Sequence, residues 1–194
     1  MKNIFSYKQS ILLSIILLFG SAANAAIINI FEIRITPSAL NTEGWLQVSE
    51  VVATETGTGN DLALASAGAT AVGSSDWPGS SPANAIDGIG PIGFPDIFHS
   101  NENDGSSFLS VKLASASSLD SVSIFGRTDA CCSQRDYYDI ALFDINGNQL
   151  FSATDLDGTN GSVTSNLNAV PLPAAVWLLG SGFLSLMVMG RRKS

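Results

Sequence analysis

Short runs in which apolar and polar residues alternate recur along the chain, and no long stretch repeats with the period of an amphipathic helix. The clearest runs are residues 31–36, 109–113 and 138–142, while 45–53 and 61–65 are two further candidate strands. Alternation places every second side chain on the same face of an extended strand. Many short strands with polar turns between them predict an all-β fold, specifically an antiparallel β-sandwich.

The predicted turns and loops complete this picture. Asn146-Gly147 stands between two alternating runs, which is typical of a hairpin in which both turn positions have positive φ. Residues 66–88 are rich in small and polar residues and are expected to be mostly loop, and the proline- and glycine-containing stretch 82–95 is expected to line a binding end. Residues 158–169 are small and polar and predict a flexible linker. The folded domain is therefore expected to span residues 26–157.

The first 25 residues have the organisation of a secretory signal peptide. Lys2 and Lys8 precede an apolar run at 11–19, and the small residues Ala23 and Ala25 follow it. We therefore expect export, and cleavage after Ala25 by signal peptidase would leave a mature chain that starts at Ala26 in a compartment where thiols can oxidise. The alternative is a buried N-terminal helix.

The last 25 residues combine a proline motif, an apolar run and a basic cluster. The run 174–190 follows the motif, and at about 1.5 Å per residue it covers about 25 Å, close to the thickness of a hydrocarbon core. We therefore expect a single transmembrane helix. The basic residues that follow it place that end in the cytoplasm, so the body lies outside. The motif and the cluster consist of Val170, Pro171, Leu172, Pro173, Arg191, Arg192 and Lys193.

This C-terminal arrangement, residues 170–194, resembles the PEP-CTERM sorting signal of Gram-negative bacteria, in the variant reading Val-Pro-Leu-Pro-Ala-Ala-Val-Trp-Leu. The resemblance implies that an exosortase recognises the tail and cuts near the proline motif. It implies an intermediate anchored in the inner membrane, followed by delivery to the cell surface, the extracellular matrix or exopolysaccharide. A plain tail anchor is the alternative.

The body between the two ends is strongly acidic. All 17 Asp and Glu residues lie between positions 32 and 157, where the basic residues are only Arg34, Lys112, Arg127 and Arg135, giving a net charge of −13. Such a charge disfavours nucleic acid as a partner. A lone His99 without a Gly-x-Ser-x-Gly element argues against a hydrolase triad. We therefore do not expect an enzyme; paired carboxylates acting as a glycosidase are the remaining catalytic alternative.

Unusual chemistry is concentrated in residues 125–135, where two of the four basic residues flank the adjacent Cys131 and Cys132. A guanidinium offers a planar fork of donors suited to oxygen-rich ligands. A salt-bridged turn is the structural alternative. In an oxidising compartment, the two cysteines pair with each other or with another molecule.

Residues 83–88, His99 and residues 127–135 together resemble the F-type lectins (fucolectins) of the discoidin-like, galactose-binding-like jelly-roll fold, over about residues 45–157. The resemblance implies that His99, Arg127 and Arg135 hold a deoxy-sugar, typically fucose. It also implies that Asp129 orients an arginine and that Cys131 and Cys132 form a vicinal disulfide against the apolar face of the sugar. The sequence departs from the family by one extra residue, Ala130, and lacks the usual Trp-rich strand at 107–112.

The same resemblance implies a structural calcium ion beside the sugar loops, held by oxygen ligands from Asn84, Asp87 and Asp96. Ca²⁺ takes six to eight hard oxygen ligands from a flexible loop, which this segment offers. The alternative is an Asx turn without a metal.

Taken together, these features predict an exported, non-enzymatic carbohydrate-binding protein, with a deoxy-sugar or exopolysaccharide as its ligand. The competing hypothesis is a structural or adhesion protein of the extracellular matrix whose domain has no sugar pocket.

Overall fold

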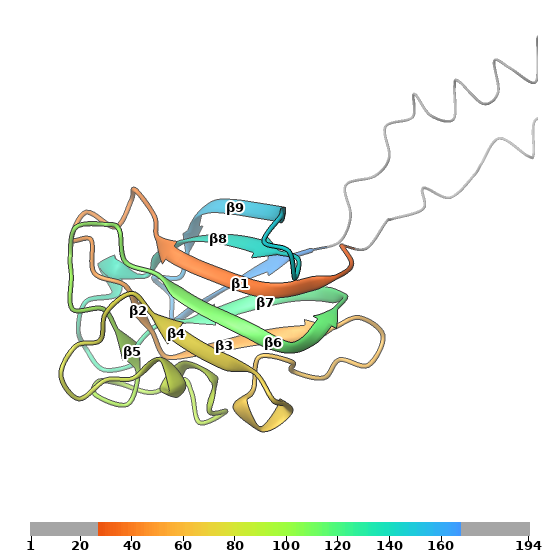
Figure 1. The fold of residues 1–194 in the computed structure, drawn as a ribbon. Coiled ribbons are helices and arrows are strands. Elements are labelled where there is room, and N and C mark those ends of the chain that lie inside the picture. The colour runs from red at the N-terminus through yellow and green to blue at the C-terminus, as the bar shows by residue number, and fades with distance from the viewer. Residues whose placement is uncertain (1–26, 168–194) are drawn as a thin grey trace, which may run out of the picture. The chain divides into compact units, whose positions relative to one another are not determined.

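The structure is a computed structural model that describes residues 27–167 (Figure 1). The predicted signal peptide and the whole sorting signal, including the predicted transmembrane helix 174–190, lie outside the described residues. Within residues 27–167, no helix has the length and apolar character needed to cross a membrane.

Five strands form the larger sheet, in the order β4-β6-β1-β8-β9, and every neighbouring pair is antiparallel. Its strands are β1 (Ile30–Pro37), β4 (Thr70–Gly73), β6 (Leu109–Ser117), β8 (Tyr137–Phe143) and β9 (Gln149–Asp157). The strands that the alternating runs 31–36, 109–113 and 138–142 predicted are thus confirmed as β1, β6 and β8. They are the three central strands of this sheet.

Three strands form a second antiparallel sheet, in the order β10-β7-β3, and a short pair, β2-β5, forms a third. The remaining elements are short: β2 (Gln47–Val48), β3 (Glu50–Glu55), β5 (Phe98–His99), β7 (Leu119–Phe125), β10 (Ser162–Asn166) and the 3-10 turns η1 (Ala65–Ala67), η2 (Pro82–Ile86) and η3 (Ser133–Arg135). The described chain is therefore all-β with antiparallel sheets, as predicted.

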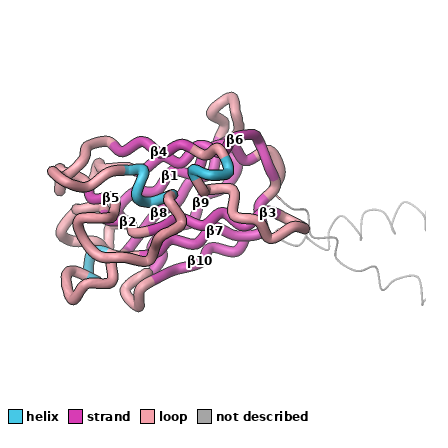
Figure 2. Tube along the Cα trace, turned by 90° about the horizontal axis from the view of Figure 1, so that it is seen from below, coloured by secondary structure: helices cyan, strands magenta, loops and turns pink. Residues whose placement is uncertain are grey.

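The apolar faces of the two larger sheets contribute to one buried cluster. Ile33 and Ile35 from β1 belong to it together with Val122 and Ile124 from β7, and each is at most 1% exposed. Burying such a side chain contributes about 1.5–3 kcal/mol to stability. This core packing holds the two larger sheets together and so fixes the positions of the strand ends from which the loops start. Figures 1 and 2 both place β2 and β5 among the long loops at one end of the sheets.

The prediction of a strand at 61–65 was wrong. Asp61 makes only an isolated bridge to Thr54, and its Oδ1 accepts hydrogen bonds from the amides of Ala53 (2.8 Å) and Ala63 (2.9 Å). An Asp side chain that bonds nearby amides in this way competes with a sheet ladder. The expectation that 66–88 is mostly loop needs a smaller correction, because it also contains the edge strand β4.

The linker predicted at 158–169 is also wrong at residues 162–166, because these form β10 and pair with β7. Ser165 and Leu167 are buried and Val163 packs against the core, so a period of two is present although small polar residues mask it. The hairpin at Asn146-Gly147 does form, between β8 and β9, but only Gly147 has positive φ. The Asp144 carboxylate organises this turn by accepting from the amides of Asn146 and Asn148.

Candidate functional site

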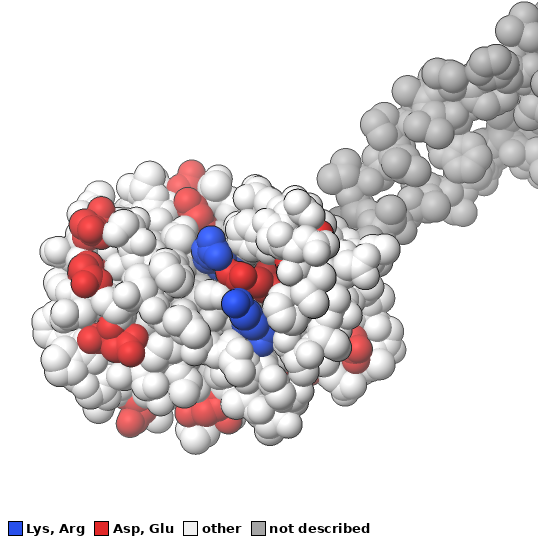
Figure 3. All heavy atoms as spheres, viewed as in Figure 1, with Lys and Arg blue, Asp and Glu red and all other residues white. Residues whose placement is uncertain are grey.

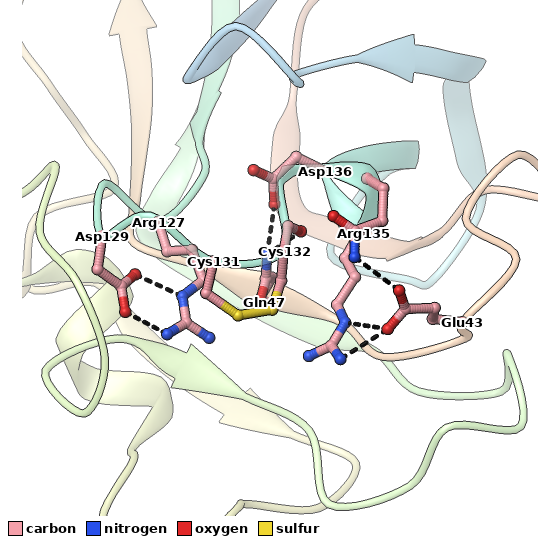
Figure 4. The surroundings of a disulfide bond; sticks show 9 residues. Glu43, Gln47, Arg127, Asp129, Cys131, Cys132, Arg135 and Asp136 are labelled. Carbon is pink, nitrogen blue, oxygen red and sulfur yellow. Dashed lines mark hydrogen bonds and ion pairs between the residues drawn. A yellow bond between two sulfur atoms is a disulfide. The ribbon is translucent and has the colours of Figure 1, made fainter.

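The cysteine pair lies in the connection between β7 and β8, where the backbone turns sharply. Cys131 and Cys132 are joined by a disulfide, Cys132 has φ 71° in the left-handed region, and η3 follows directly. Arg127 precedes the disulfide and Arg135 follows it. Figure 4 shows the disulfide between the two guanidinium groups, with Arg127 beside Cys131 and Arg135 on the side of Cys132.

Both arginines line one pocket of about 250 Å³, although Ala130 adds a residue between Asp129 and Arg135. A tight turn, in which the Cys131 amide donates to the Asp129 carbonyl (2.6 Å), precedes η3 in this connection. The pocket is lined by Trp45, Trp77, Phe94, His99, Arg127 and Arg135. The structure thus places three of the predicted sugar-binding residues, His99 and the two arginines, around one cavity.

Arg127 is held by a carboxylate two residues further along the chain. Its Nε donates to Asp129 Oδ1 (2.6 Å) and its Nη2 donates to Asp129 Oδ2. The guanidinium lies 5.7 Å from the ring centre of Phe94, and the side chain is only 9% exposed. Hydrogen bonding to Arg127 lowers the pKa of Asp129, so this carboxylate stays charged and keeps the arginine in place. These hydrogen bonds use Nε and Nη2 and leave Nη1 unused among the described residues.

Arg135 is held in the same manner, by a residue far away in the sequence. Its Nε donates to Glu43 Oε2 (2.6 Å), and Gln134 donates to the other oxygen of Glu43 (2.7 Å). These two hydrogen bonds lower the pKa of Glu43. The guanidinium lies 5.9 Å from the Trp45 ring centre. Each arginine is therefore fixed on one edge by a carboxylate and packed over an aromatic ring.

His99, on β5, is buried and has a defined tautomer. Its Nδ1 lies 2.7 Å from the carbonyl oxygen of Ser100, which can only accept a hydrogen bond, so Nδ1 carries the proton and Nε2 is an acceptor. Burial lowers the pKa of His99, and the charges of Arg135 and Arg127 lower it further. The imidazole is therefore neutral at physiological pH.

Aromatic rings form much of the pocket wall. Trp45 and Trp77 meet edge to face with ring centres 5.3 Å apart, and both lie within 5.5 Å of the His99 ring. The Trp77 amide donates to the His99 carbonyl (2.8 Å), which fixes the Trp77 loop to β5. Phe94 contributes a further ring, 6.2 Å from His99. The wall is consequently apolar, with the arginine and histidine nitrogens set into it.

A buried polar network lies beneath the disulfide. Gln47 donates to the carbonyl of Cys132 (3.0 Å) and to Asp136 Oδ1 (2.9 Å), and the Tyr138 hydroxyl contacts the same oxygen (3.0 Å). Burial raises the pKa of Asp136 to about 6. Gly126 is required here, because a Cβ at that position would lie 2.3 Å from Asp136 Oδ2. The network ties the cysteine turn to the core.

Of the residues predicted to bind calcium, Asn84 lies within η2, and Asp87 and Asp96 lie in the loop that leads from η2 to β5. Asn84 is half-buried, Asp87 and Asp96 are exposed, and Asp87 Oδ1 accepts from the Ile89 amide (2.8 Å), which is an Asx turn. Within residues 27–167, no group of three or more His, Cys, Asp or Glu side chains is arranged to hold a metal ion.

One carboxylate that the sequence did not single out faces the same loop. Glu50 is 4% exposed, and its Oε2 accepts from the amides of Gly88 and Gly90, each at 3.2 Å. Its Oε1 is buried and has no hydrogen-bond partner among the described residues. Burial raises the pKa of Glu50 to about 7, and the nearby charge of Asp87 also raises it. Glu50 Oε1 is therefore a buried carboxylate oxygen without a partner in the described part of the chain, directed at the loop that carries Asp87.

No family model matches the chain, and neither a curated protein nor a solved structure is significantly similar to it.

Sequence reasoning missed much of the pocket wall, namely Trp45, Trp77 and Phe94, together with the orienting residue Glu43. Large aromatic residues in segments rich in Gly, Ser and Pro are the signal that was available, because Trp77 and Phe94 both lie in such loops. Glu43 carries no comparable signal, since only the fold brings it to Arg135.

Proposed function

We propose that this protein is a carbohydrate-binding protein with a galactose-binding-like jelly-roll sandwich similar to that of the F-type lectins. The observation that carries the proposal is the pocket in which Arg127, Arg135 and neutral His99 lie beside flat aromatic rings. Sugars are bound by a few convergent polar groups together with an apolar surface against the C–H face of the ring.

The polar groups of the pocket suit hydroxyl and ring oxygens. Each arginine bonds a carboxylate through the Nε and Nη2 edge of its guanidinium and retains Nη1 as a donor. His99 Nε2 adds an acceptor for a sugar hydroxyl. The charges of Arg127 and Arg135 are balanced by Asp129 and Glu43, so the ligand of this pocket is a neutral sugar such as a deoxy-sugar. In this proposal, the disulfide of Cys131 and Cys132 packs against the sugar's apolar face.

Binding without catalysis is the proposed activity. The carboxylates bonded to the two pocket arginines, Asp129 and Glu43, have lowered pKa values. A carboxylate of lowered pKa is a poor general acid, so neither Asp129 nor Glu43 suits the general-acid role that a glycosidase requires.

We also propose a calcium ion held by Asn84, Asp87 and Asp96, and by Glu50 in addition. The unpaired buried oxygen of Glu50 supports its inclusion as a ligand, because Ca²⁺ would be the positively charged partner that this carboxylate lacks. The loop that carries Asp87 continues to Phe94 and His99. The ion would therefore stabilise the segment that forms part of the pocket wall.

Export by the signal peptide and sorting by an exosortase to the cell surface or exopolysaccharide complete the proposal. They rest on residues 1–25 and 170–194 of the sequence.

The proposal is tested by screening the purified chain on a glycan array and then measuring the affinity for the bound sugar. We expect Arg127→Ala to weaken binding about ten- to a hundredfold, because a charge-assisted hydrogen bond contributes about 1.5–3 kcal/mol. Arg127→Lys keeps the charge but loses the planar fork, so it should restore little. Asn146→Ala, in the exposed β8–β9 turn, is the control. A correctly folded protein that binds no glycan would contradict the proposal and favour the structural matrix alternative.

A further inference from the structure

A second depression, of about 200 Å³, lies on the outward face of the five-stranded sheet. The strand register explains how it forms: Arg34 of β1 lies opposite Ser110 of β6, and Glu32 lies opposite Lys112. Val72 of β4 continues the row beyond Ser110. Its lining residues are Glu32, Arg34, Val72, Phe108, Ser110 and Lys112, and we call this set the sheet groove.

Arg34 repeats the arrangement of the two pocket arginines. Its Nε (3.1 Å) and Nη2 (2.7 Å) donate to Glu32 Oε1, which also accepts from the Ser110 hydroxyl (3.0 Å). Its guanidinium lies 5.7 Å from the ring centre of Phe108 and 4.9 Å from that of Phe143. Within residues 27–167, Nη1 has no hydrogen-bond partner. An arginine held by a carboxylate, packed over rings and open on one edge thus occurs here for the third time.

The charge of the sheet groove differs from that of the first pocket. Arg34 and Lys112 outnumber the single carboxylate of Glu32, which leaves one net positive charge in a body of net charge −13. The four basic residues of residues 27–167 are divided equally between the two depressions. Figure 3 shows two blue groups with red atoms between them near the middle of the viewed face. Lys112 is exposed and forms no ion pair with another described residue.

We propose that the sheet groove is a second binding site and that its ligand is an acidic saccharide, a sugar unit that carries a carboxylate. Lys112 and the open edge of Arg34 complement the carboxylate, and this pairing of charge is what selects an acidic unit. Phe108 and Val72, which is 58% exposed, offer apolar surface to the sugar ring. The site does not depend on the first pocket, whose charges are balanced. A polysaccharide that contains both neutral and acidic units would be bound at two places on one domain.

The test is equilibrium binding of a short oligouronate to the full chain in mild detergent, measured by calorimetry at about physiological ionic strength. A short oligomer is used because the 17 acidic residues of the body repel a long polyanion. The neutral, carboxyl-reduced form of the same oligomer is the matched probe. Oligoglutamate of equal charge and inorganic phosphate are tested as competitors.

We expect the oligouronate to bind at least tenfold more tightly than its carboxyl-reduced form. Lys112→Gln should weaken binding about two- to fivefold, as expected for an exposed charge. Arg34→Gln should weaken it about tenfold or more, because it removes a charge-assisted donor. Lys112 is exposed, so its variant reports on binding even where Arg34→Gln destabilises the fold.

Three results would overturn the proposal. Equal affinity for the neutral oligomer would remove the role of the carboxylate. Displacement by oligoglutamate or phosphate at equal concentration would show a general anion site rather than a saccharide site. Loss of oligouronate binding in Arg127→Gln but not in Lys112→Gln would place the acidic sugar in the first pocket.

Discussion

The buried carboxylate of Asp136 allows a sharp prediction about stability and pH. The side chain is 1% exposed, and burial raises its pKa from the ordinary 3.8 to about 6. Each unit of pKa difference between the folded and unfolded states corresponds to about 1.4 kcal/mol, so a shift of about two units corresponds to about 3 kcal/mol. The perturbation we choose is Asp136→Asn, which cannot ionise and keeps an oxygen for Gln47 and Tyr138.

The sign follows from where the proton binds more tightly. Because the pKa is raised in the folded protein, folding favours the protonated form of Asp136. Its contribution to the free energy of unfolding is fully present below about pH 4 and is lost as the pH rises towards about 6. At pH 7 the folded protein keeps a buried charge that the asparagine variant does not have. Between pH 3.5 and 7, the free energy of unfolding of the variant should therefore rise relative to that of the wild type by up to about 3 kcal/mol.

The assay is urea unfolding of both proteins across this pH range, with the free energy of unfolding compared at each pH. Comparing the two proteins cancels the other titrating groups. Asp144→Asn is the matched control with the opposite sign, because hydrogen bonds from Asn148 lower the pKa of Asp144. That variant should lose stability relative to the wild type only at the acid end of the range, as the pH rises to just above the ordinary pKa of 3.8, and the difference should then stay constant up to pH 7. A difference between Asp136→Asn and wild type that is constant across the range would refute the reasoning.

Three further predictions concern the metal, the cysteines and the tail. Adding a chelator should lower the melting temperature of the wild type, since an ion present at a hundredfold excess over its Kd contributes about 2.7 kcal/mol; Glu50→Gln should greatly reduce this response, and an identical response in both proteins would show that Glu50 is not a ligand. Replacing both Cys131 and Cys132 by Ser should leave the melting temperature nearly unchanged, because a bond between adjacent residues closes almost no loop, but should weaken sugar binding. A large fall in melting temperature at unchanged affinity would argue for a purely structural disulfide. Intact-mass measurement of surface-released protein should find a C-terminus within residues 170–173; recovery of chains that end at Ser194 from the matrix fraction would contradict cleavage near the proline motif.

The central strands were predictable because they obey a period of two on a half-buried surface. Ile33 and Ile35 are buried while Arg34 between them is exposed, so the alternation is visible in the sequence. β10 was not predictable by the same reasoning, because Ser165 occupies a buried position in it and the strand looks like a polar segment. Its place in the sheet comes from pairing with β7, and pairing is a property of the fold rather than of local composition.

In the candidate site, too, some contacts could be predicted from the sequence and others could not, and the difference has a physical cause. Arg127 and Asp129 are two residues apart, so their contact is local and could be expected from the sequence. Arg135 and Glu43 are far apart in the chain, and they meet because the fold brings the cysteine turn next to the segment before β2. Without Glu43 the open edge of Arg135 would have no fixed direction. An acidic chain with very few arginines can thus still present ordered donors, because three of its carboxylates are used to orient three arginines rather than to bind a ligand.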